Sequence, residues 1–232
     1  MSTVGIIVGG GTGDRFGRQG GKQFAPLVGS TVLGHTLAAF EACDAIDEIV
    51  VVTHPDTVAE CAELVAPFGK VVAVVAGGAT RQDSVASGLA ATDDDAEIIV
   101  VHDGARPLVL PATIAEVVMS LLGSDDAGVI VGHPSYDTIK RVDTAALVIA
   151  TEDRERLWVA QTPQAFRAQV LRDAYAAAAS ADAPPATDDA ALVERMGGAV
   201  RMVSGPRDNL KITVPEDLAV AEEVLARRGR RT

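Results

Sequence analysis

Short runs of β-branched apolar residues alternate with amphipathic stretches along the first half of the chain, and this alternation limits what the chain can fold into. The apolar runs predict strands at residues 4–8, 48–53, 71–75, 98–101 and 129–131. Stretches with apolar residues at helical spacing lie between these runs, at residues 31–42, 56–66, 81–91 and 111–122. Near-continuous apolar strands separated by helices favour an α/β fold with a mostly parallel sheet covered on both faces. Ligands of such sheets bind outside the carboxyl ends of the strands.

The alternation breaks after about residue 133. Residues 133–160 form a polar stretch with weak strand signals at 138–142 and 147–151, which fits either an ordinary connection or an arm reaching out from the sheet. Beyond it we expect helices at 168–179, from 187 and from 215, strands at 200–203 and 210–214, a linker at 181–186 and a solvated basic tail at 227–231. We predict a single domain over residues 1–232 with an arm at about 134–160.

Composition excludes several classes of protein. The chain has 232 residues, of which 48% are hydrophobic, so it can bury about two-thirds of its unfolded surface and is not disordered. Its 20 Lys and Arg against 32 Asp and Glu give a net charge of −12, which argues against a partner nucleic acid or anionic membrane. Two cysteines, no secretory signal and no membrane-spanning apolar run favour a cytoplasmic protein.

A glycine-rich loop, GGGTGDRFG at residues 9–17, follows the first predicted strand and is followed by Lys22. Glycines let the backbone approach a phosphate chain and turn its N–H groups toward it. Phe16 stands where both the dinucleotide fingerprint and the mononucleotide P-loop require glycine. The loop therefore matches neither of these two motifs. It predicts a phosphate site of another type, in which Arg15 and Lys22 are the cations. The alternative interpretation is a flexible turn.

Two more clusters end predicted strands. GGATRQDS at residues 77–84 leads into a helix, whose N-terminus either binds an anion or polar base or is a simple capping turn. HDGARP at residues 102–107 places Asp103 and Arg106 where they can hold a sugar hydroxyl, a metal or a phosphate, or form a structural salt bridge. His102 by itself is expected to be a hydrogen-bonded core or loop histidine.

Four polar clusters lie in the second half of the chain, where core packing needs none of them. They are DTIKR at 137–141, TEDR at 151–154, QTPQ at 161–164 and NLKIT at 209–213. Each alone fits a solvated surface as well as a site. Together with the first half they suggest a site for a polyanion on an acidic protein.

From the glycine loop to Lys211 the chain resembles the cytidylyltransferases, and most closely the 2-C-methyl-D-erythritol 4-phosphate cytidylyltransferase family of the non-mevalonate isoprenoid pathway. The stretches that carry the resemblance cover nearly the whole chain in the family's order: GGGTGDRFG with GKQF, GGATRQDSV, HDGARP, DTIKR, TEDRERLW, QTPQAF, TDDAALVE, and DNLKIT with PEDL. The resemblance implies a Rossmann-like fold of the nucleotide-diphospho-sugar transferase type with an extended β-arm. It also implies that a sugar-alcohol phosphate attacks the α-phosphorus of CTP and releases pyrophosphate.

The resemblance further implies roles for individual residues. Residues implied in catalysis are Arg15, Lys22 and Lys211. Residues implied in nucleotide binding are Gly10, Gly11, Thr12, Gly13, Gly78, Ala79, Ser84, Asp103 and Gly104. Residues implied in binding the acceptor are Asp103, Arg106, Thr138, Arg154 and Lys211. Mg²⁺ would bridge the CTP phosphates without a dedicated set of protein ligands, and the arm would be exchanged within a homodimer, so that Arg154 serves the neighbouring site.

The chain departs from the family pattern at several positions. The loop opens with three glycines at residues 9–11 instead of Ala-Ala-Gly, glycine replaces proline at Gly21 and alanine at Gly104, and Tyr136 stands where a small polar residue is commoner. A glycine pair in the loop also occurs in ribitol-5-phosphate cytidylyltransferases, so ribitol or another alditol phosphate is an alternative acceptor. A non-catalytic sugar-nucleotide sensor is a second alternative, and a nicotinamide oxidoreductase is disfavoured by Phe16.

Overall fold

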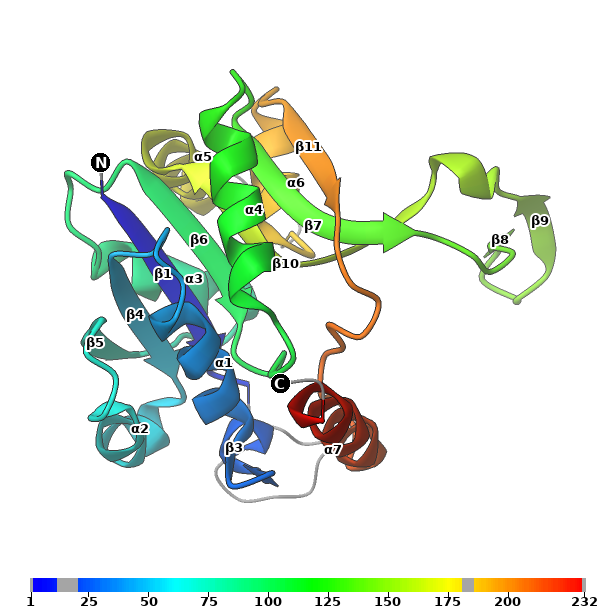
Figure 1. Ribbon diagram of the computed structural model, residues 1–232. Coiled ribbons are helices and arrows are strands. Elements are labelled where there is room, and N and C mark those ends of the chain that lie inside the picture. The colour runs from blue at the N-terminus through cyan, green and yellow to red at the C-terminus, as the bar shows by residue number, and fades with distance from the viewer. Residues whose placement is uncertain (1, 12–20, 181–185, 231–232) are drawn as a thin grey trace.

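The computed structural model describes residues 2–11, 21–180 and 186–230. Its centre is a seven-stranded sheet with the order β11-β7-β10-β6-β1-β4-β5 (Figure 1). These strands are β1 (Thr3–Gly9), β4 (Glu48–Thr53), β5 (Val71–Ala76), β6 (Ile98–Asp103), β7 (Gly128–Pro134), β10 (Trp158–Arg167) and β11 (Val200–Ser204). All neighbours pair in parallel except β10, which runs antiparallel to both β6 and β7. The predicted mostly parallel sheet is confirmed.

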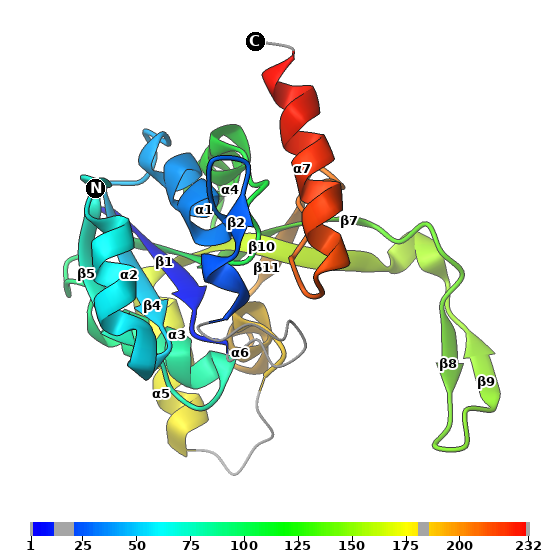
Figure 2. The same cartoon turned by 90° about the horizontal axis from the view of Figure 1, so that it is seen from below.

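Helices cover both faces of the sheet (Figure 2). One face packs against α1 (Val32–Glu41), α2 (Val58–Val65) and α4 (Pro111–Leu122). The other face packs against α3 (Arg81–Ala90), α5 (Ala168–Ser180) and α6 (Asp189–Arg195). Because β1, β4 and β6 are buried on both sides, they can be apolar along their whole length.

A third, smaller cluster joins the C-terminal helix to the body. Helix α7 (Glu216–Gly229) buries Ala221 and Val224 against the hairpin of β2 (Pro26–Leu27) and β3 (Ser30–Thr31) and against Ile212. None of the helices in the described part of the chain has the length and apolar character that a membrane crossing requires.

Short polar side chains fix where the helices begin. Thr31 precedes α1 and accepts a hydrogen bond from the Gly34 amide, and Asp188 does the same for the Ala191 amide of α6. Thr80 and Asp83 form a reciprocal capping box at the start of α3. The N-terminus of α3 is therefore well defined, and this end of the helix lies at the carboxyl edge of the sheet.

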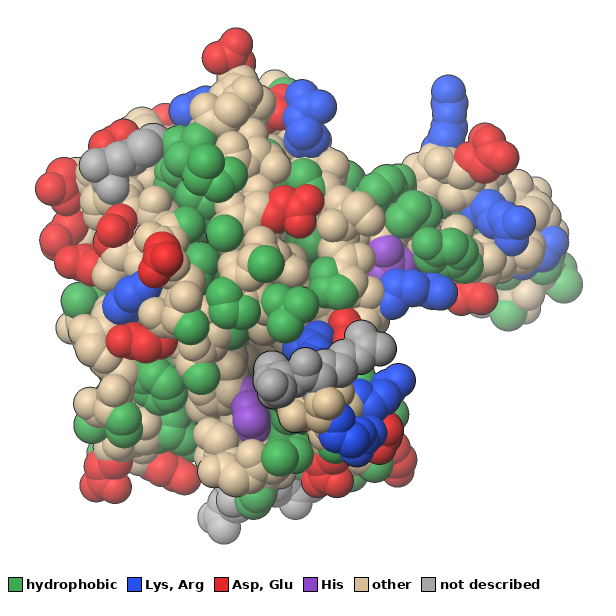
Figure 3. All heavy atoms as spheres, in the orientation of Figure 1, with side chains coloured by type: hydrophobic (Ala, Val, Ile, Leu, Met, Phe, Trp, Pro, Cys, Tyr) green, Lys and Arg blue, Asp and Glu red, His purple; other side chains and the backbone are tan. Residues whose placement is uncertain are grey.

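The segment between β7 and β10 stands away from the body of the molecule, and we call residues 134–160 the arm (Figures 1 and 2). It contains a hairpin of β8 (Lys140–Val142) and β9 (Val148–Thr151), so both weak strand signals of this stretch are confirmed. Hydrophobic and basic side chains are visible on its surface (Figure 3). Leu147, Val148 and Ile149 are 60% exposed or more in the single chain.

Strand β10 is missing from the sequence prediction, which placed an arm up to residue 160 and a helix from 168. Its central part carries the polar residues Gln161, Thr162 and Gln164, yet all three are buried. Their side chains bond to groups far away in the sequence, including Asp188 and the Asp103 amide. A strand whose central residues are polar and hydrogen-bonded in this way is not detected when strands are predicted from apolar runs.

The predicted strand at 210–214 is wrong. Residues 210–214 form no strand, and their backbone pairs with no strand of the sheet in the described residues. The Ile212 amide donates to the Ala105 carbonyl, and the Thr213 and Val214 amides donate to the Asp217 carboxylate. The apolar pattern reflects burial of Ile212 against α7 rather than membership of the sheet.

Candidate active site

A cavity of about 480 Å³ opens at the carboxyl ends of β1, β4, β5 and β6, the edge where the sequence places a ligand. Its walls come from the end of β1, the start of a short 3-10 helix, the turns after β4, β5 and β6, and the segment before α7. The residues that form them are Val8, Gly9, Gly10, Gly11, Lys22, Gln23, His54, Pro55, Gly77, Gly78, Ala79, Thr80, Arg81, Ser84, Asp103, Ala105 and Lys211.

Most predicted site residues of the described body meet at this cavity. Those that line it are Gly10, Gly11, Lys22, Gly78, Ala79, Ser84, Asp103 and Lys211. Gly104 and Arg106 lie directly beside it, since the Gly104 amide bonds to the Val8 carbonyl and Arg106 pairs with Asp103. Three further predicted residues lie outside the described residues: Thr12, Gly13 and Arg15.

The turn between β5 and α3 is built by close packing. A Cβ atom at Gly78 would lie 2.3 Å from the Cβ atom of Asp83, so glycine is required there. Asp83 belongs to the capping box with Thr80, and the Ser84 hydroxyl donates to the Thr80 carbonyl at 2.9 Å. The capping turn expected as the simpler reading is present, and it forms one wall of the cavity.

Lys22 begins the 3-10 helix Lys22–Phe24. Gly21 before it has φ +90°, a left-handed conformation that favours glycine. Gln23 after it is buried, and its side chain lies so close to Gly21 that a Cβ atom there would be 2.5 Å from it. Packing of this kind fixes the backbone that carries Lys22 at the cavity wall.

Asp103, at the end of β6, is the centre of a charge cluster. Its Oδ1 accepts from Arg81 Nε at 3.2 Å, and its Oδ2 lies 3.0 Å from Lys211 Nζ and 3.3 Å from Arg106 Nε. Burial raises the pKa of this carboxyl, but the three cations outweigh burial and hold the pKa well below its usual range. The expected salt bridge with Arg106 is confirmed, and the same carboxylate lines the cavity.

The side chains of His102 and Thr162 hold the backbone at Asp103 and Arg106 in place through hydrogen bonds. His102 Nε2 lies 3.4 Å from the Arg106 carbonyl, which only accepts, so Nε2 carries the proton. The Thr162 hydroxyl then donates to His102 Nδ1 and accepts the Asp103 N–H, both at 3.0 Å. Burial lowers the His102 pKa to about 3, so the ring is neutral. The prediction of a hydrogen-bonded core histidine is confirmed.

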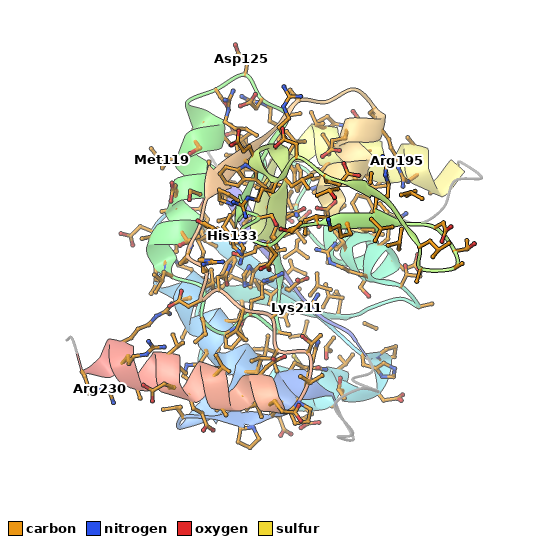
Figure 4. The ribbon with its side chains drawn as sticks, turned by 90° about the vertical axis from the view of Figure 1, so that its right-hand side faces the viewer. Met119, Asp125, His133, Arg195, Lys211 and Arg230 are labelled. Carbon is orange, nitrogen blue, oxygen red and sulfur yellow. The ribbon has the colours of Figure 1, made fainter. Side chains whose placement is uncertain are left out.

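Lys211 lies on the segment between β11 and α7 (Figure 4). Asn209 anchors this segment, because its buried side chain donates to Gln161 Oε1 and to the Thr162 carbonyl, while its own carbonyl accepts from Arg106 Nη1 at 2.9 Å. The NLKIT cluster is therefore tied to β10 and to the turn after β6. This anchoring holds Lys211 opposite Asp103.

Two predicted acceptor residues lie elsewhere. Thr138 and Arg154 belong to the exposed arm, and neither lines the cavity formed by the described residues of the same chain. Arg154 Nη1 donates to the Tyr136 carbonyl at 3.0 Å.

Several residues of the site were missed by the sequence analysis. Arg81, Gln23 and His54 line the cavity, and Asp189 and Tyr175 lie behind Arg81. Arg81 and Asp189 stand inside the motifs GGATRQDSV and TDDAALVE, so the signal was present. The order of the motifs along the chain does not show that Asp189 of TDDAALVE contacts Arg81 of GGATRQDSV.

Comparison with known proteins gives a consistent result. The family model described as "2-C-methyl-D-erythritol 4-phosphate cytidylyltransferase" (IspD) matches residues 3–227. The curated protein of that name from Syntrophotalea carbinolica is 44% identical over 233 residues, covering 99% of this chain and 98% of its own length. The one from Geotalea uraniireducens is 42% identical over 230 residues, with 97% of each chain covered.

Solved structures agree with the sequence comparisons. The 4-diphosphocytidyl-2C-methyl-D-erythritol synthase of Anaerococcus prevotii superimposes with a TM-score of 0.87 at 28% identity, covering 97% of this chain and 96% of that one. The 2-C-methyl-D-erythritol 4-phosphate cytidylyltransferase of Thermus thermophilus gives a TM-score of 0.77 at 33% identity, covering 97% and 98%. The match spans the arm as well as the sheet.

Proposed function

The chain belongs to the 2-C-methyl-D-erythritol 4-phosphate cytidylyltransferase family, and from this premise we propose that it transfers the cytidylyl group of CTP to 2-C-methyl-D-erythritol 4-phosphate. The products are 4-diphosphocytidyl-2-C-methyl-D-erythritol and pyrophosphate, a step of isoprenoid precursor synthesis. The observation that carries the proposal is the cavity beside the glycine loop, in which Lys22 and Lys211 converge with Asp103. The relatives named above all carry this activity in their names, and none carries the ribitol or sensor alternative.

The chemistry demands little beyond positioning and positive charge. The attacking phosphate oxygen is ionised at neutral pH, so no general base is required. Negative charge develops around the α-phosphorus as the new P–O bond forms and pyrophosphate departs. Cations that are already fixed beside this position stabilise the charge, and the site does not have to reorganise during the reaction. Lys22 fits this role in the described residues, and Arg15 is its predicted partner.

The charge cluster at Asp103 prepares the acceptor site. Without substrate, Asp103 Oδ2 holds both Lys211 and Arg106. The Lys211 side chain is 38% exposed, whereas that of Arg106 is 12% exposed and also bonds to the Asn209 carbonyl. An arriving phosphate therefore draws Lys211 away from Asp103 more readily than it moves Arg106. Lys211 orients the acceptor phosphate for attack, and Arg106 remains with Asp103 at the wall.

The cavity fits a magnesium ion that is carried by the nucleotide. Mg²⁺ typically takes one or two carboxylates together with substrate phosphates and water. Asp103 is the carboxylate that the described lining offers, and the described residues contain no group of three or more His, Cys, Asp or Glu that could hold the ion by themselves. A magnesium ion held there would neutralise part of the charge of the CTP phosphates, and Asp103 is the side chain that would help to hold it. Lys22 and Lys211 supply the remaining positive charge.

The chain acts as a single domain whose arm completes the active site of a second copy in a homodimer. Support comes from the arm's exposed apolar side chains, among them Leu147, Val148 and Trp158, which association would cover. Further support is that Arg154 and Thr138 belong to the arm, which stands away from the body (Figure 1), and that neither lines the cavity formed by the described residues of their own chain. In the dimer these two residues bind the acceptor phosphate in the neighbouring cavity.

Pyrophosphate release tests the proposed function. The protein is assayed with CTP and Mg²⁺ and either 2-C-methyl-D-erythritol 4-phosphate or ribitol 5-phosphate at equal concentration, and again with UTP in place of CTP. We expect strong preference for CTP and the methylerythritol phosphate. Preference for ribitol phosphate would overturn the acceptor assignment. Silence with both acceptors, with CTP binding retained, would favour the sensor alternative.

A Lys22→Ala variant tests the proposed role of Lys22 in catalysis. Turnover should fall by orders of magnitude while the unfolding temperature changes little, because Lys22 is partly exposed at the cavity wall. Turnover close to that of the unmodified protein would remove Lys22 from the mechanism.

A further inference from the structure

Asp189 is a buried carboxylate that lies behind the wall of the cavity. It is the first residue of α6, its side chain is fully buried, and it is not part of the cavity lining. Arg81 Nη2 donates to its Oδ2 at 2.8 Å, and the Tyr175 hydroxyl donates to its Oδ1 at 2.5 Å. Both carboxylate oxygens are thus satisfied by groups from α3 and α5. The proposed mechanism assigns no role to this arrangement.

Arg81 connects Asp189 to the reacting centre. Its Nη2 bonds to Asp189 while its Nε bonds to Asp103 Oδ1, so one guanidinium bridges a carboxylate outside the cavity and a carboxylate that lines it. Burial lowers the Arg81 pKa, but the two carboxylates outweigh burial and raise it above its ordinary value. A guanidinium whose Nε and Nη2 are each held by a buried carboxylate cannot turn toward a ligand without breaking one of these ion pairs.

The three cations around Asp103 therefore differ in freedom. Arg81 donates to Oδ1 through Nε and is also held through Nη2 by Asp189, whereas Lys211 shares Oδ2 with Arg106 and is the most exposed of the three. When Lys211 turns to a phosphate, Asp103 loses one of the two cations on Oδ2 and keeps Arg106 there, while Arg81 is the cation that holds Oδ1 in place. We propose that Asp189 is a positioning residue for cytidylyl transfer, which acts by holding Arg81 on Asp103 while Lys211 moves to the substrate.

This role predicts the effect of removing the charge of Asp189. In Asp189→Asn the side chain keeps its shape and can still accept from Tyr175, but its amide N–H groups face Arg81 and release it. Arg81 then competes with Lys211 for Asp103 or turns toward the phosphates. We expect kcat to fall at least tenfold, while the KM for CTP stays within about threefold of its value in the unmodified enzyme, because the pocket gains positive charge rather than losing it.

Asp188→Asn is the matched control. Asp188 precedes Asp189, caps the same helix through the Ala191 amide and accepts from Gln164, but the structure gives it no bond to Arg81. Asparagine is as good an N-cap as aspartate, so this variant should keep kcat within about threefold. Tyr175→Phe is the second variant, because it removes one hydrogen bond and leaves the ion pair intact, so it should fold and show a smaller loss than Asp189→Asn.

A double-mutant cycle separates positioning from a general loss of structure. If Asp189 acts through Arg81 on Asp103, Asp189→Asn should lower kcat by less than threefold when Asp103 is already Asn. The same tenfold loss in both backgrounds would overturn the inference. So would an active, folded Asp189→Asn enzyme with unchanged kcat, or loss of binding for both substrates in Tyr175→Phe.

The inference rests on the proposed function, and the two fail in different ways. The unmodified enzyme is assayed first with CTP and the methylerythritol phosphate. A silent unmodified enzyme contradicts the proposed function, whereas an active one with an equally active Asp189→Asn variant contradicts the role of Asp189 alone. CTP binding by calorimetry gives a readout for each variant that does not depend on turnover.

Discussion

His102 titrates differently in the folded and the unfolded chain. Burial lowers its pKa to about 3 in the folded protein, whereas histidine in an unfolded chain has a pKa of about 6.5. Between these two values the unfolded chain binds a proton that the folded protein does not. The free energy of unfolding therefore rises with pH across this window. Acidification from pH 6.5 toward pH 3 removes the part of it that the neutral His102 contributes. The neutral ring matters to the site because it supports the backbone of Asp103 through Thr162.

Replacing His102 should reduce this acid sensitivity. Between pH 7 and pH 5 the histidine should lower the free energy of unfolding by about 2 kcal/mol, since the unfolded chain takes up a proton over this interval and one full proton is worth about 1.4 kcal/mol per pH unit. His102→Gln retains a donor and an acceptor but has no titrating group at this position, so the loss of stability between pH 7 and pH 5 should be smaller in this variant by about 2 kcal/mol. Urea unfolding at pH 7 and pH 5 measures the difference. Equal pH dependence in both proteins would contradict the buried neutral ring.

The arm is the element whose placement matters most for the acceptor. Where it leaves the sheet, Arg207 of the segment after β11 lies over the Tyr136 ring, with Cζ 3.9 Å from the ring centroid. The Tyr136 carbonyl accepts from Arg154, which begins the short 3-10 helix Arg154–Arg156 on the returning part of the arm. Tyr136 therefore joins the base of the arm to the segment that carries Lys211. The residue that departs from the family pattern has a structural role in this chain.

Arg207→Gln should loosen the base of the arm. An exposed cation–π contact is worth roughly 0.5–1 kcal/mol, which corresponds to a two- to five-fold rise in the KM for the methylerythritol phosphate. The KM for CTP should not change, because Arg207 is not part of the cavity lining. Steady-state kinetics with each substrate varied in turn measures both values. Tyr136→Phe keeps the ring and serves as the control, and a rise in the KM for CTP alone would argue against this coupling.

Over the whole molecule, an acidic chain concentrates cations at one edge of its sheet. The net charge is −12, yet Arg81, Arg106 and Lys211 gather around Asp103, with Lys22 on the same cavity. The arm carries Arg154 away from that cluster. Under the proposed function, one active site needs Lys22 and Lys211 from one chain and Arg154 from another. A second copy of the chain is therefore required to bind both polyanionic substrates.

Mixing two inactive variants tests this assembly. In a heterodimer of Lys22→Ala and Arg154→Ala subunits, one cavity keeps Lys22 and receives an intact Arg154 from its neighbour. Random exchange of equal amounts should restore about a quarter of the normal activity, because half the dimers are mixed and each has one complete site. Demonstrated subunit exchange without recovery would show that each arm serves its own chain.

The prediction from sequence succeeded where the signal is local. The strands β1, β4, β6 and β7 contain continuous apolar runs because both faces of the sheet are covered there, and β5 at the edge of the sheet keeps an apolar run although part of it is exposed. A run of this kind can be recognised from a few neighbouring residues. The turn that begins at the end of β1 with Gly9, Gly10 and Gly11 and the capped start of α3 were located for the same reason, since turn and cap residues act over three or four positions.

Other features were decided by the tertiary structure. Strand β10 is polar in its middle and is buried because Gln161, Thr162 and Gln164 find partners across the fold. The ion pair of Arg81 with Asp189 joins residues 108 positions apart. The sequence by itself determined the strands of the sheet except β10, the edge of the sheet at which the cavity lies, and the family to which the chain belongs. The tertiary structure decided which acid neutralises which cation, because the free energy of a buried charge depends on its neighbours in space.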